Sequence, residues 1–282
     1  MASRYRIEHT SRYEYDRSVT RSFNEARLTP LQTPWQTRLE ARITVEPMTW
    51  THRYLDYWGT EVRVFEVDKI HNALEVRASS LVEVDATRRP AAGEPSWAEL
   101  RSDRTRDEYI EYLTQTPFTD PPVELADLAD SIAADEPPAE AARQIGEAVH
   151  SAVTYRSGVT QVHTTAGEAW AAGSGVCQDH AHLVVGALRH IGLPARYVSG
   201  YLHPSREPKI GQATVGESHA WVEFWLGEWV AQDPTNLAPV AERHVMVGTG
   251  RDYGDVPPIK GIVAGAHETV GLTVTVELTR LA

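Results

Sequence analysis

Residues 173–196 read GSGVCQDHAHLVVGALRHIGLPAR, and this segment carries the strongest structural signals in the chain. Ser174 is a favoured N-cap residue, and Gly192 followed by Pro194 is a favoured helix stop. The segment therefore predicts one helix between these positions. Its broad apolar face consists of Val176, Ala181, Val184, Val185, Leu188 and Ile191.

Cys177, in the first turn of this helix, is the single cysteine of the chain. One cysteine excludes intrachain disulfides and an all-cysteine metal cage. Unpaired backbone N–H groups and the helix dipole favour an anion at a helix start, so the position suits a nucleophilic thiolate. Gly173 and Gly175 leave room for a substrate beside the sulfur. The residues alone leave two interpretations open, a reactive thiol and a small side chain packed at a tight turn.

A second segment, GESHAWVEFWLGEWVAQDPTN (216–236), predicts a hairpin with strands at 219–226 and up to 233. A two-residue turn at 227–228 would place His219 and Asp233 on opposite faces. A three-residue loop at 226–228 pairs position 224 with 230 and 221 with 233, which puts both side chains on one face within hydrogen-bonding reach. We therefore predict an odd-length loop or a bulge. The alternative is an ordinary aromatic sheet face with His219 at the surface.

The first 90 residues are expected to form an antiparallel β-sandwich or barrel. Their apolar residues alternate at period two in four segments: RYRIEHTSRYEYD (4–16), LEARITVEP (39–47), HRYLDYWGTEVRVFEVD (52–68) and NALEVRASSLVEVDA (72–86). Proline clusters then predict a linker with short helices over 91–138. A helix at 139–153 opens an α+β part that runs over 139–282 and ends on a strand at 271–280.

Composition excludes several classes of protein. The 282 residues are 41% hydrophobic, which argues against wholesale disorder, and their charge is 27 − 39 = −12. This acidic balance favours neither nucleic acid nor an anionic membrane as a partner. No segment approaches the ~20 apolar residues of a membrane span. The first residues lack the apolar run of a secretory signal, so a cytoplasmic location is expected.

Three motifs in order, GSGVCQDHAHL (173–183), SHAWVEFWL (218–226) and WVAQDPTN (229–236), resemble the transglutaminase-like superfamily of papain-like fold. The start YRIEHTSRYEY (5–15) and the late block GRDYGDVPPIKG (250–261) are similar to its bacterial two-part members. The resemblance implies an α+β fold in which an N-terminal β domain precedes a core whose cysteine-bearing helix packs on an antiparallel sheet.

The resemblance also implies a catalytic triad: Cys177 as nucleophile, His219 as general base and acid, and Asp233 as the group that orients the imidazole. The expected activity is thiol-dependent acyl transfer on amide bonds of a peptide or protein, through an acyl-thioester. Hydrolysis is favoured, and transamidation of protein glutamine is the alternative. No cofactor or metal is expected.

Other residues near the motifs allow two interpretations each. Gln178 is an oxyanion donor or a solvated helix residue. Asp179 either bonds to nearby backbone or to the 196–201 segment, or it complements the helix dipole. Tyr201 lines the cleft or belongs to the core. His182 is expected to be a structural hydrogen-bonding residue, and His180 departs from the aromatic residue typical of the family.

Two rival classes remain. A metal site from Cys177, His180, His182 and His219 has poor spacing. A non-catalytic relative that binds peptides would not need an intact Cys/His/Asp set.

Overall fold

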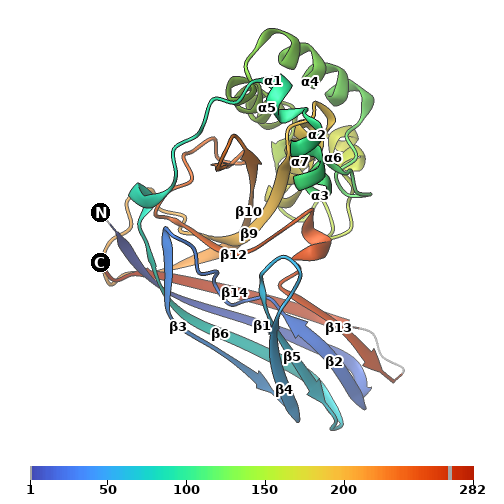
Figure 1. Ribbon diagram of the computed structural model, residues 1–282. Helices are drawn as coiled ribbons and strands as arrows, with labels where there is room; N and C mark the ends of the chain where they lie inside the picture. Colours follow the sequence, from blue (N-terminus) through green and yellow to red (C-terminus); the bar gives the residue numbers. More distant parts are fainter. Residues whose placement is uncertain (1, 266–268) are drawn as a thin grey trace.

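The computed structural model describes residues 2–265 and 269–282, and it divides into a β-rich end and a helix-rich end (Figure 1). The N-terminal half consists of long strands, as their alternating patterns predict: β1 (Ser3–Val19), β2 (Arg21–Ala26), β3 (Gln36–Glu46), β4 (Trp50–Leu55), β5 (Glu61–Val67) and β6 (His71–Val84). In β1 buried and exposed side chains alternate over its first half. The predicted antiparallel β-rich N-terminal part is confirmed.

Two sheets share these strands. The larger has the order β12-β9-β10-β14-β1-β6-β3, with β11 also paired to β10, and the smaller has the order β13-β2-β5-β4. Apolar side chains from both sheets, including Phe65, Val67, Leu74 and Val76, form the core between them.

The helices lie between residues 86 and 190, apart from the 3₁₀ turn η2 (Tyr253–Asp255). They are η1 (Ala86–Arg88), α1 (Trp97–Leu100), α2 (Asp103–Glu108), α3 (Ile110–Leu113), α4 (Val123–Asp135), α5 (Pro138–Ala152), α6 (Ala166–Ala172) and α7 (Cys177–His190). The segment predicted as a linker thus holds the three short helices and also the 13-residue α4. Leu125 and Ala129 of α4 are buried in the helical core.

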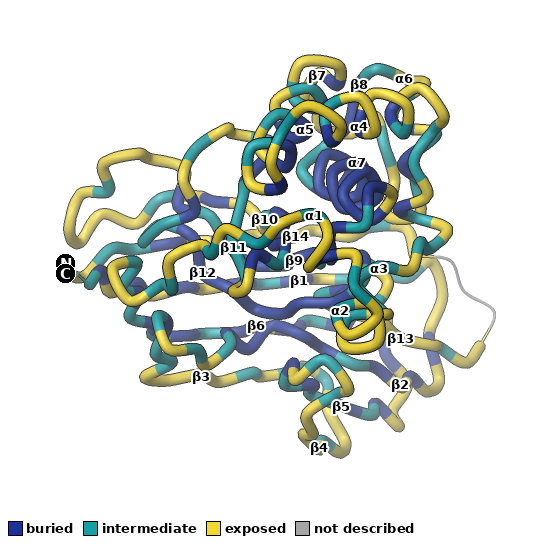
Figure 2. The backbone as a smooth tube through the Cα atoms, turned by 45° about the horizontal axis from the view of Figure 1, so that its top comes forward, coloured by how far each residue is buried: buried dark blue, intermediate teal, exposed yellow. Residues whose placement is uncertain are grey.

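Helix α7 is the centre of the helical part, and Figure 2 shows it buried along its length. The predicted apolar face is confirmed except for Val176, which precedes the helix and is only partly buried. Polar residues on the other faces of α7 are buried as well, because α4, α5, α6 and the sheet surround it. The predicted N-cap at Ser174 is wrong: β8 (Ser174–Gly175) pairs in parallel with β7 (Thr154–Tyr155), and the helix begins three residues later. The predicted stop is confirmed, since Gly192 has φ +84°.

The remaining strands are β9 (Ala195–Leu202), β10 (Ala213–Trp225), β11 (Trp229–Gln232), β12 (His244–Gly250), β13 (Ile259–Ala264) and β14 (Thr269–Arg280). Strand β10 joins the two ends of the molecule, because its first residues pair with β14 and its later ones with β9.

The last two strands pair with the N-terminal ones, β14 with β1 and β13 with β2. The domain boundaries at residues 90 and 138 stay a prediction. They did not anticipate that β13 and β14 pair with strands of the N-terminal part. Among the described residues, no helix is both long enough and apolar enough to cross a bilayer.

Candidate functional site

The β10–β11 hairpin has the register that brings His219 and Asp233 to one face. Phe224 pairs with Val230 and Trp225 with Trp229, and the N–H of Leu226 donates to the carbonyl of Glu228. The three-residue loop is therefore confirmed. His219 Nε2 lies 2.8 Å from Asp233 Oδ2, so the predicted contact between these side chains forms.

Asp233 is fully buried and accepts hydrogen bonds from several neighbours. Its Oδ2 lies 2.9 Å from Asn236 Nδ2 and 3.3 Å from His244 Nε2, in addition to the bond with His219. Its Oδ1 accepts the backbone N–H groups of Thr235 and Asn236 at 3.0 and 3.1 Å. Burial raises the pKa of Asp233, but the hydrogen bonds from His219 and His244 outweigh it and hold the pKa far below its usual range.

Cys177 is partly buried at the first position of α7 and lines the same cavity as His219. Because Nε2 of the imidazole faces Asp233, Nδ1 remains for the sulfur. Burial lowers the pKa of His219, yet the bonds to Asp233 and Cys177 prevail and raise it to about 10. The histidine therefore carries a proton at neutral pH, between a carboxylate and a sulfur.

The beginning of α7 supplies free hydrogen-bond donors beside the sulfur. The carboxylate of Asp179 accepts the N–H of Val176 and the hydroxyl of Thr160, both at 2.7 Å. The predicted bond of Asp179 to nearby backbone is thus observed, and its position in the first turn of α7 also suits the helix dipole. Within the described chain, the backbone N–H groups of Cys177 and Gln178 have no acceptor.

Gln178 is buried and lines the cavity that contains Cys177. Its Nε2 donates to the carbonyl of Val162 at 3.0 Å, so it is not a solvated helix residue. One N–H of the same amide stays available to a bound molecule.

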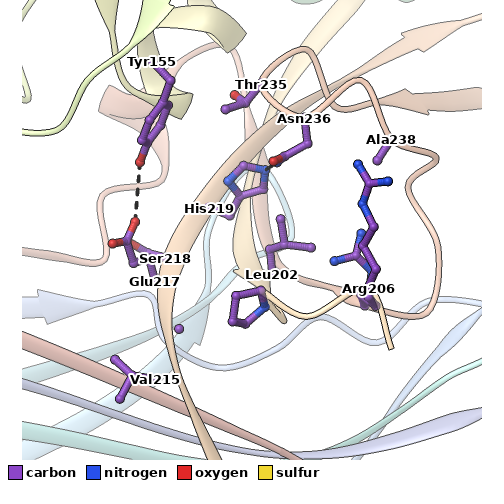
Figure 3. Close-up of a pocket in the computed structure, with 13 residues that line it drawn as sticks. Tyr155, Leu202, Arg206, Val215, Glu217, Ser218, His219, Thr235, Asn236 and Ala238 are labelled. Carbon is purple, nitrogen blue, oxygen red and sulfur yellow. Dashed lines mark hydrogen bonds between the residues drawn. The ribbon is translucent and has the colours of Figure 1, made fainter. Parts of the chain in front are cut away.

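Two adjoining cavities meet at His219. One, of about 420 Å³, contains Cys177, Gln178 and Tyr197. The other, of about 480 Å³, lacks the cysteine, and Figure 3 shows Arg206 on the opposite side of His219 from Tyr155 and Glu217. Tyr155, Gly216, Glu217, Ser218 and His219 line both cavities. The Tyr155 hydroxyl lies 3.5 Å from Glu217 Oε2.

The metal set of Cys177, His180, His182 and His219 is not assembled. Both ring nitrogens of His180 face backbone carbonyls, at 3.0 and 2.9 Å. His182 accepts the N–H of Tyr253 at 3.1 Å, and burial lowers the pKa of His182 to about 3, so this histidine is neutral and has the structural role expected of it.

A different group, His219, Asp233 and His244, has donor atoms within 4.8 Å of one another. These atoms bond directly to each other, with Asp233 Oδ2 at 2.8 and 3.3 Å from the two rings. A bound metal ion would have to replace both hydrogen bonds.

Tyr201 lies outside the cleft. It is buried between the two ends of the molecule, and its hydroxyl bonds to His9 Nδ1 at 3.0 Å. Of the two interpretations, the core residue is the one observed, and Tyr197, four residues earlier on β9, is the tyrosine that lines the cavity of Cys177.

Sequence reasoning missed two residues of the site. Asn236 completes an Asp-Pro-Thr-Asn turn that binds the Asp233 carboxylate, a pattern typical of Asx turns, so a local signal existed. His244 lies on β12, and no pattern near it in the sequence points to Asp233. Its Nδ1 accepts the N–H of Ala241 at 3.3 Å, which leaves Nε2 as the donor to Asp233.

Two family models match this chain. The transglutaminase-like superfamily matches residues 126–234, and the bacterial transglutaminase-like N-terminal region matches residues 5–83. The crystal structure of a candidate cysteine protease from Cytophaga hutchinsonii superposes with a TM-score of 0.78 at 21% identity, over 100% of this chain and 92% of that one. This likeness supports the fold.

Several curated proteins are similar in sequence. An uncharacterized protein of Mycobacterium leprae is 42% identical over 279 residues, 99% of each chain. One of Mycobacterium tuberculosis is 34% identical over 98% of this chain and 92% of its own. A protein-glutamine gamma-glutamyltransferase of Pseudomonas aeruginosa is 39% identical over 71 residues, 23% of this chain and 11% of that protein. The superfamily model spans Cys177, His219 and Asp233, and the N-terminal model matches the strands that precede it, so this chain belongs to the transglutaminase-like superfamily.

Proposed function

We propose that this protein is a thiol-dependent acyl-transfer enzyme that hydrolyses amide bonds of a peptide or protein. Cys177 acts as the nucleophile, His219 as general acid and base, and Asp233 as the residue that orients the imidazole. The observation that carries the proposal is that Cys177 and His219 line one cavity, with His219 Nε2 at 2.8 Å from the buried carboxylate of Asp233. A buried, multiply bonded carboxylate behind a histidine fixes one orientation of the ring.

In the first half of the reaction, the Cys177 thiolate attacks the amide carbonyl carbon and a C–S bond forms. The N–H groups of Cys177 and Gln178 donate to the oxygen as negative charge develops on it. His219 gives its Nδ1 proton to the amide nitrogen, the C–N bond breaks, and the amine leaves. An acyl-thioester remains on Cys177.

In the second half, water enters the same cavity. His219 takes a proton from the water as its oxygen attacks the thioester carbonyl, the C–S bond breaks, and the acid leaves. The thiolate and the protonated imidazole are restored, so each turnover consumes one amide and one water.

Transamidation of glutamine side chains is the second candidate. The 71-residue similarity to a protein-glutamine gamma-glutamyltransferase favours it. A primary amine would then replace water in the second half, with the same three residues.

The test compares the wild type with Cys177→Ala, which removes the only thiol of the chain. Each protein is incubated with a mixed peptide library and a primary amine probe, and products are identified by mass spectrometry. Cleaved or deamidated peptides from the wild type alone support hydrolysis. Amine-labelled glutamine from the wild type alone supports transamidation.

His219→Ala is expected to remove the products as Cys177→Ala does. His52→Ala, which alters an exposed residue of β4, is the control and should leave them in place. Equal product yields from the wild type and Cys177→Ala would refute the proposal.

A further inference from the structure

The two cavities beside His219 suit the two parts of a bound amide, the acyl part and the amine part. The acyl carbon has to reach the sulfur of Cys177, which lines only one of the cavities. The amine part has to remain within reach of His219, which protonates it. The second cavity contains His219 and lacks the cysteine, so it suits the amine part.

Two arginines, Arg206 and Arg243, line this second cavity. Arg243 is partly buried, and its NH1 donates to the carbonyls of His203 and Ser205 at 2.8 and 3.4 Å. The N–H of His203 returns a bond to the carbonyl of Arg243 at 3.0 Å. These bonds hold the segment that carries Arg206 against β12, so the cavity wall is built in place.

Neither guanidinium forms an ion pair with a carboxylate in the described part of the chain. Arg206 has no hydrogen-bond partner there, and Nε and NH2 of Arg243 have none either. Acidic side chains outnumber basic ones by 39 to 27, and many other arginines do pair with carboxylates, for example Arg196 with Glu223 at 2.6 Å. Unpaired guanidiniums in such a chain leave donors that match a carboxylate in geometry and charge.

The same cavity contains one carboxylate, Glu217, next to Tyr155. Figure 3 shows both on the opposite side of His219 from Arg206. The charges therefore lie apart, with the anion near the reaction centre and the guanidinium of Arg206 beyond it. An anionic group is accommodated at the arginine end.

We propose that Arg206 and Arg243 bind a carboxylate on the amine part of the substrate, either an acidic side chain or the C-terminal carboxylate of a peptide. This inference rests on the proposed function, because it takes its division of the substrate from the roles of Cys177 and His219. It holds for hydrolysis and for transamidation alike, since both use an amine at this position.

The test measures binding and turnover separately. Cys177→Ala protein is titrated with fluorescent pentapeptide libraries that are N-acylated and differ at one fixed position. One library has Glu with a C-terminal amide, one has Gln with a C-terminal amide, and one has Gln with a free C-terminal carboxylate. We expect one of the two carboxylate-bearing libraries to bind about tenfold tighter than the neutral one, and salt to weaken this preference.

In the same Cys177→Ala background, Arg206→Gln is expected to reduce the preference to less than about threefold, and Arg243→Lys to weaken it while keeping the charge. Arg206 is exposed and forms neither a hydrogen bond nor an ion pair with the described residues, so its variant tests binding without loosening the fold. Arg42→Gln on β3, an exposed arginine far from the cavity, should keep the preference. Equal affinity for all three libraries would overturn the inference.

Turnover of the same libraries by the wild type keeps the two proposals apart. Cysteine-dependent turnover without a carboxylate preference in binding refutes the inference and leaves the proposed function standing. A carboxylate preference in binding that depends on Arg206, without turnover of any library, supports the recognition site and counts against the proposed function.

Discussion

His219 lies between two groups that both favour its protonated form. Asp233 and Cys177 together raise the pKa of His219 to about 10 although burial lowers it. Asp233 resists protonation because His219, His244 and Asn236 all donate to it. Above the pKa of His219 the imidazole loses its proton, and with it the acid that the leaving amine requires. Activity is therefore expected to fall on the alkaline side as pH rises toward 10.

Asp233→Asn is expected to lower the alkaline limit of the pH–rate profile, because the carboxylate that raises the pKa of His219 is gone. The amide also accepts at one end and donates at the other, so the ring loses its fixed orientation. By analogy with serine triads, kcat should fall about 10²- to 10⁴-fold. The pH dependence of kcat/KM measures the first effect. An unchanged alkaline limit would show that Asp233 does not control the protonation of His219.

The rate of alkylation of the Cys177 thiol tests its interaction with His219. At pH 6 a free thiol, with a pKa of about 8.5, is almost entirely protonated. With protonated His219 as its partner, Cys177 should react with iodoacetamide at least about tenfold faster than glutathione does. His219→Ala should remove this advantage, and His52→Ala should keep it. Equal rates for the wild type and glutathione would contradict activation of the Cys177 thiol by His219. Mass spectrometry measures the rate without any substrate.

At the scale of the elements, the position of Cys177 depends on how closely α7 packs. A Cβ atom on Gly186 would lie 1.8 Å from the carbonyl oxygen of Thr119, an atom of the backbone that cannot turn aside. The Arg189 guanidinium, one turn later, binds the carbonyls of Thr114, Ala195 and Arg251. The helix is thus fixed both to the segment before α4 and to the sheet.

Gly186→Ala is expected to destabilise the protein by about 2–4 kcal/mol, because the methyl group forces α7 away from Thr119. Gly167→Ala is the matched control, since no atom lies within 4 Å of its added Cβ in α6. It should be neutral or stabilising by up to about 1 kcal/mol, the helix preference for alanine over glycine. Urea denaturation measures both. Equal stabilities for the two variants would show that this contact is looser than the structure has it.

At the scale of the whole molecule, the β-rich end and the helix-rich end that holds Cys177 are joined by β10 and by a buried polar contact. His9 of β1 bonds to the hydroxyl of Tyr201 on β9 and to Ser11 at 2.9 Å. Burial lowers the pKa of His9 to about 4, so the folded protein keeps this ring neutral. An unfolded chain binds a proton there already near pH 6.5.

Stability is therefore expected to decrease as pH falls from about 6.5 to about 4, because the unfolded state binds more protons in that window. Each such histidine lowers the free energy of unfolding by up to about 1.4 kcal/mol for each pH unit within this window. His182, whose pKa burial also lowers, has a similar effect. His9→Gln should reduce the slope of the free energy of unfolding against pH by the contribution of one histidine. His52→Gln, exposed on β4, should not change it. Urea midpoints at several pH values measure the slope, and an unaltered slope in His9→Gln would contradict the assignment.

Much of this architecture could be predicted from local patterns. Alternation predicted the long strands β1 and β6, and apolar spacing with Gly192 and Pro194 predicted helix α7 and its end. For the β10–β11 hairpin, the 21 residues left two turn lengths open, and the structure has the three-residue loop that brings His219 to Asp233. The strands and the helix depend on neighbours in the chain, which is why local patterns were sufficient for them.

Other features depend on partners far away in the chain. The start of α7 was misplaced because Ser174 pairs with Thr154 in a parallel bridge, a contact that competes with capping. Tyr201 was assigned to either cleft or core, and only the packing of His9 against it distinguishes them. His244, the second histidine on Asp233, has no local signature. Folding brings such groups together by pairing strands remote in sequence. The hydrogen bonds that Asp233 accepts keep it ionised against the effect of burial, and its carboxylate in turn favours the protonated form of His219.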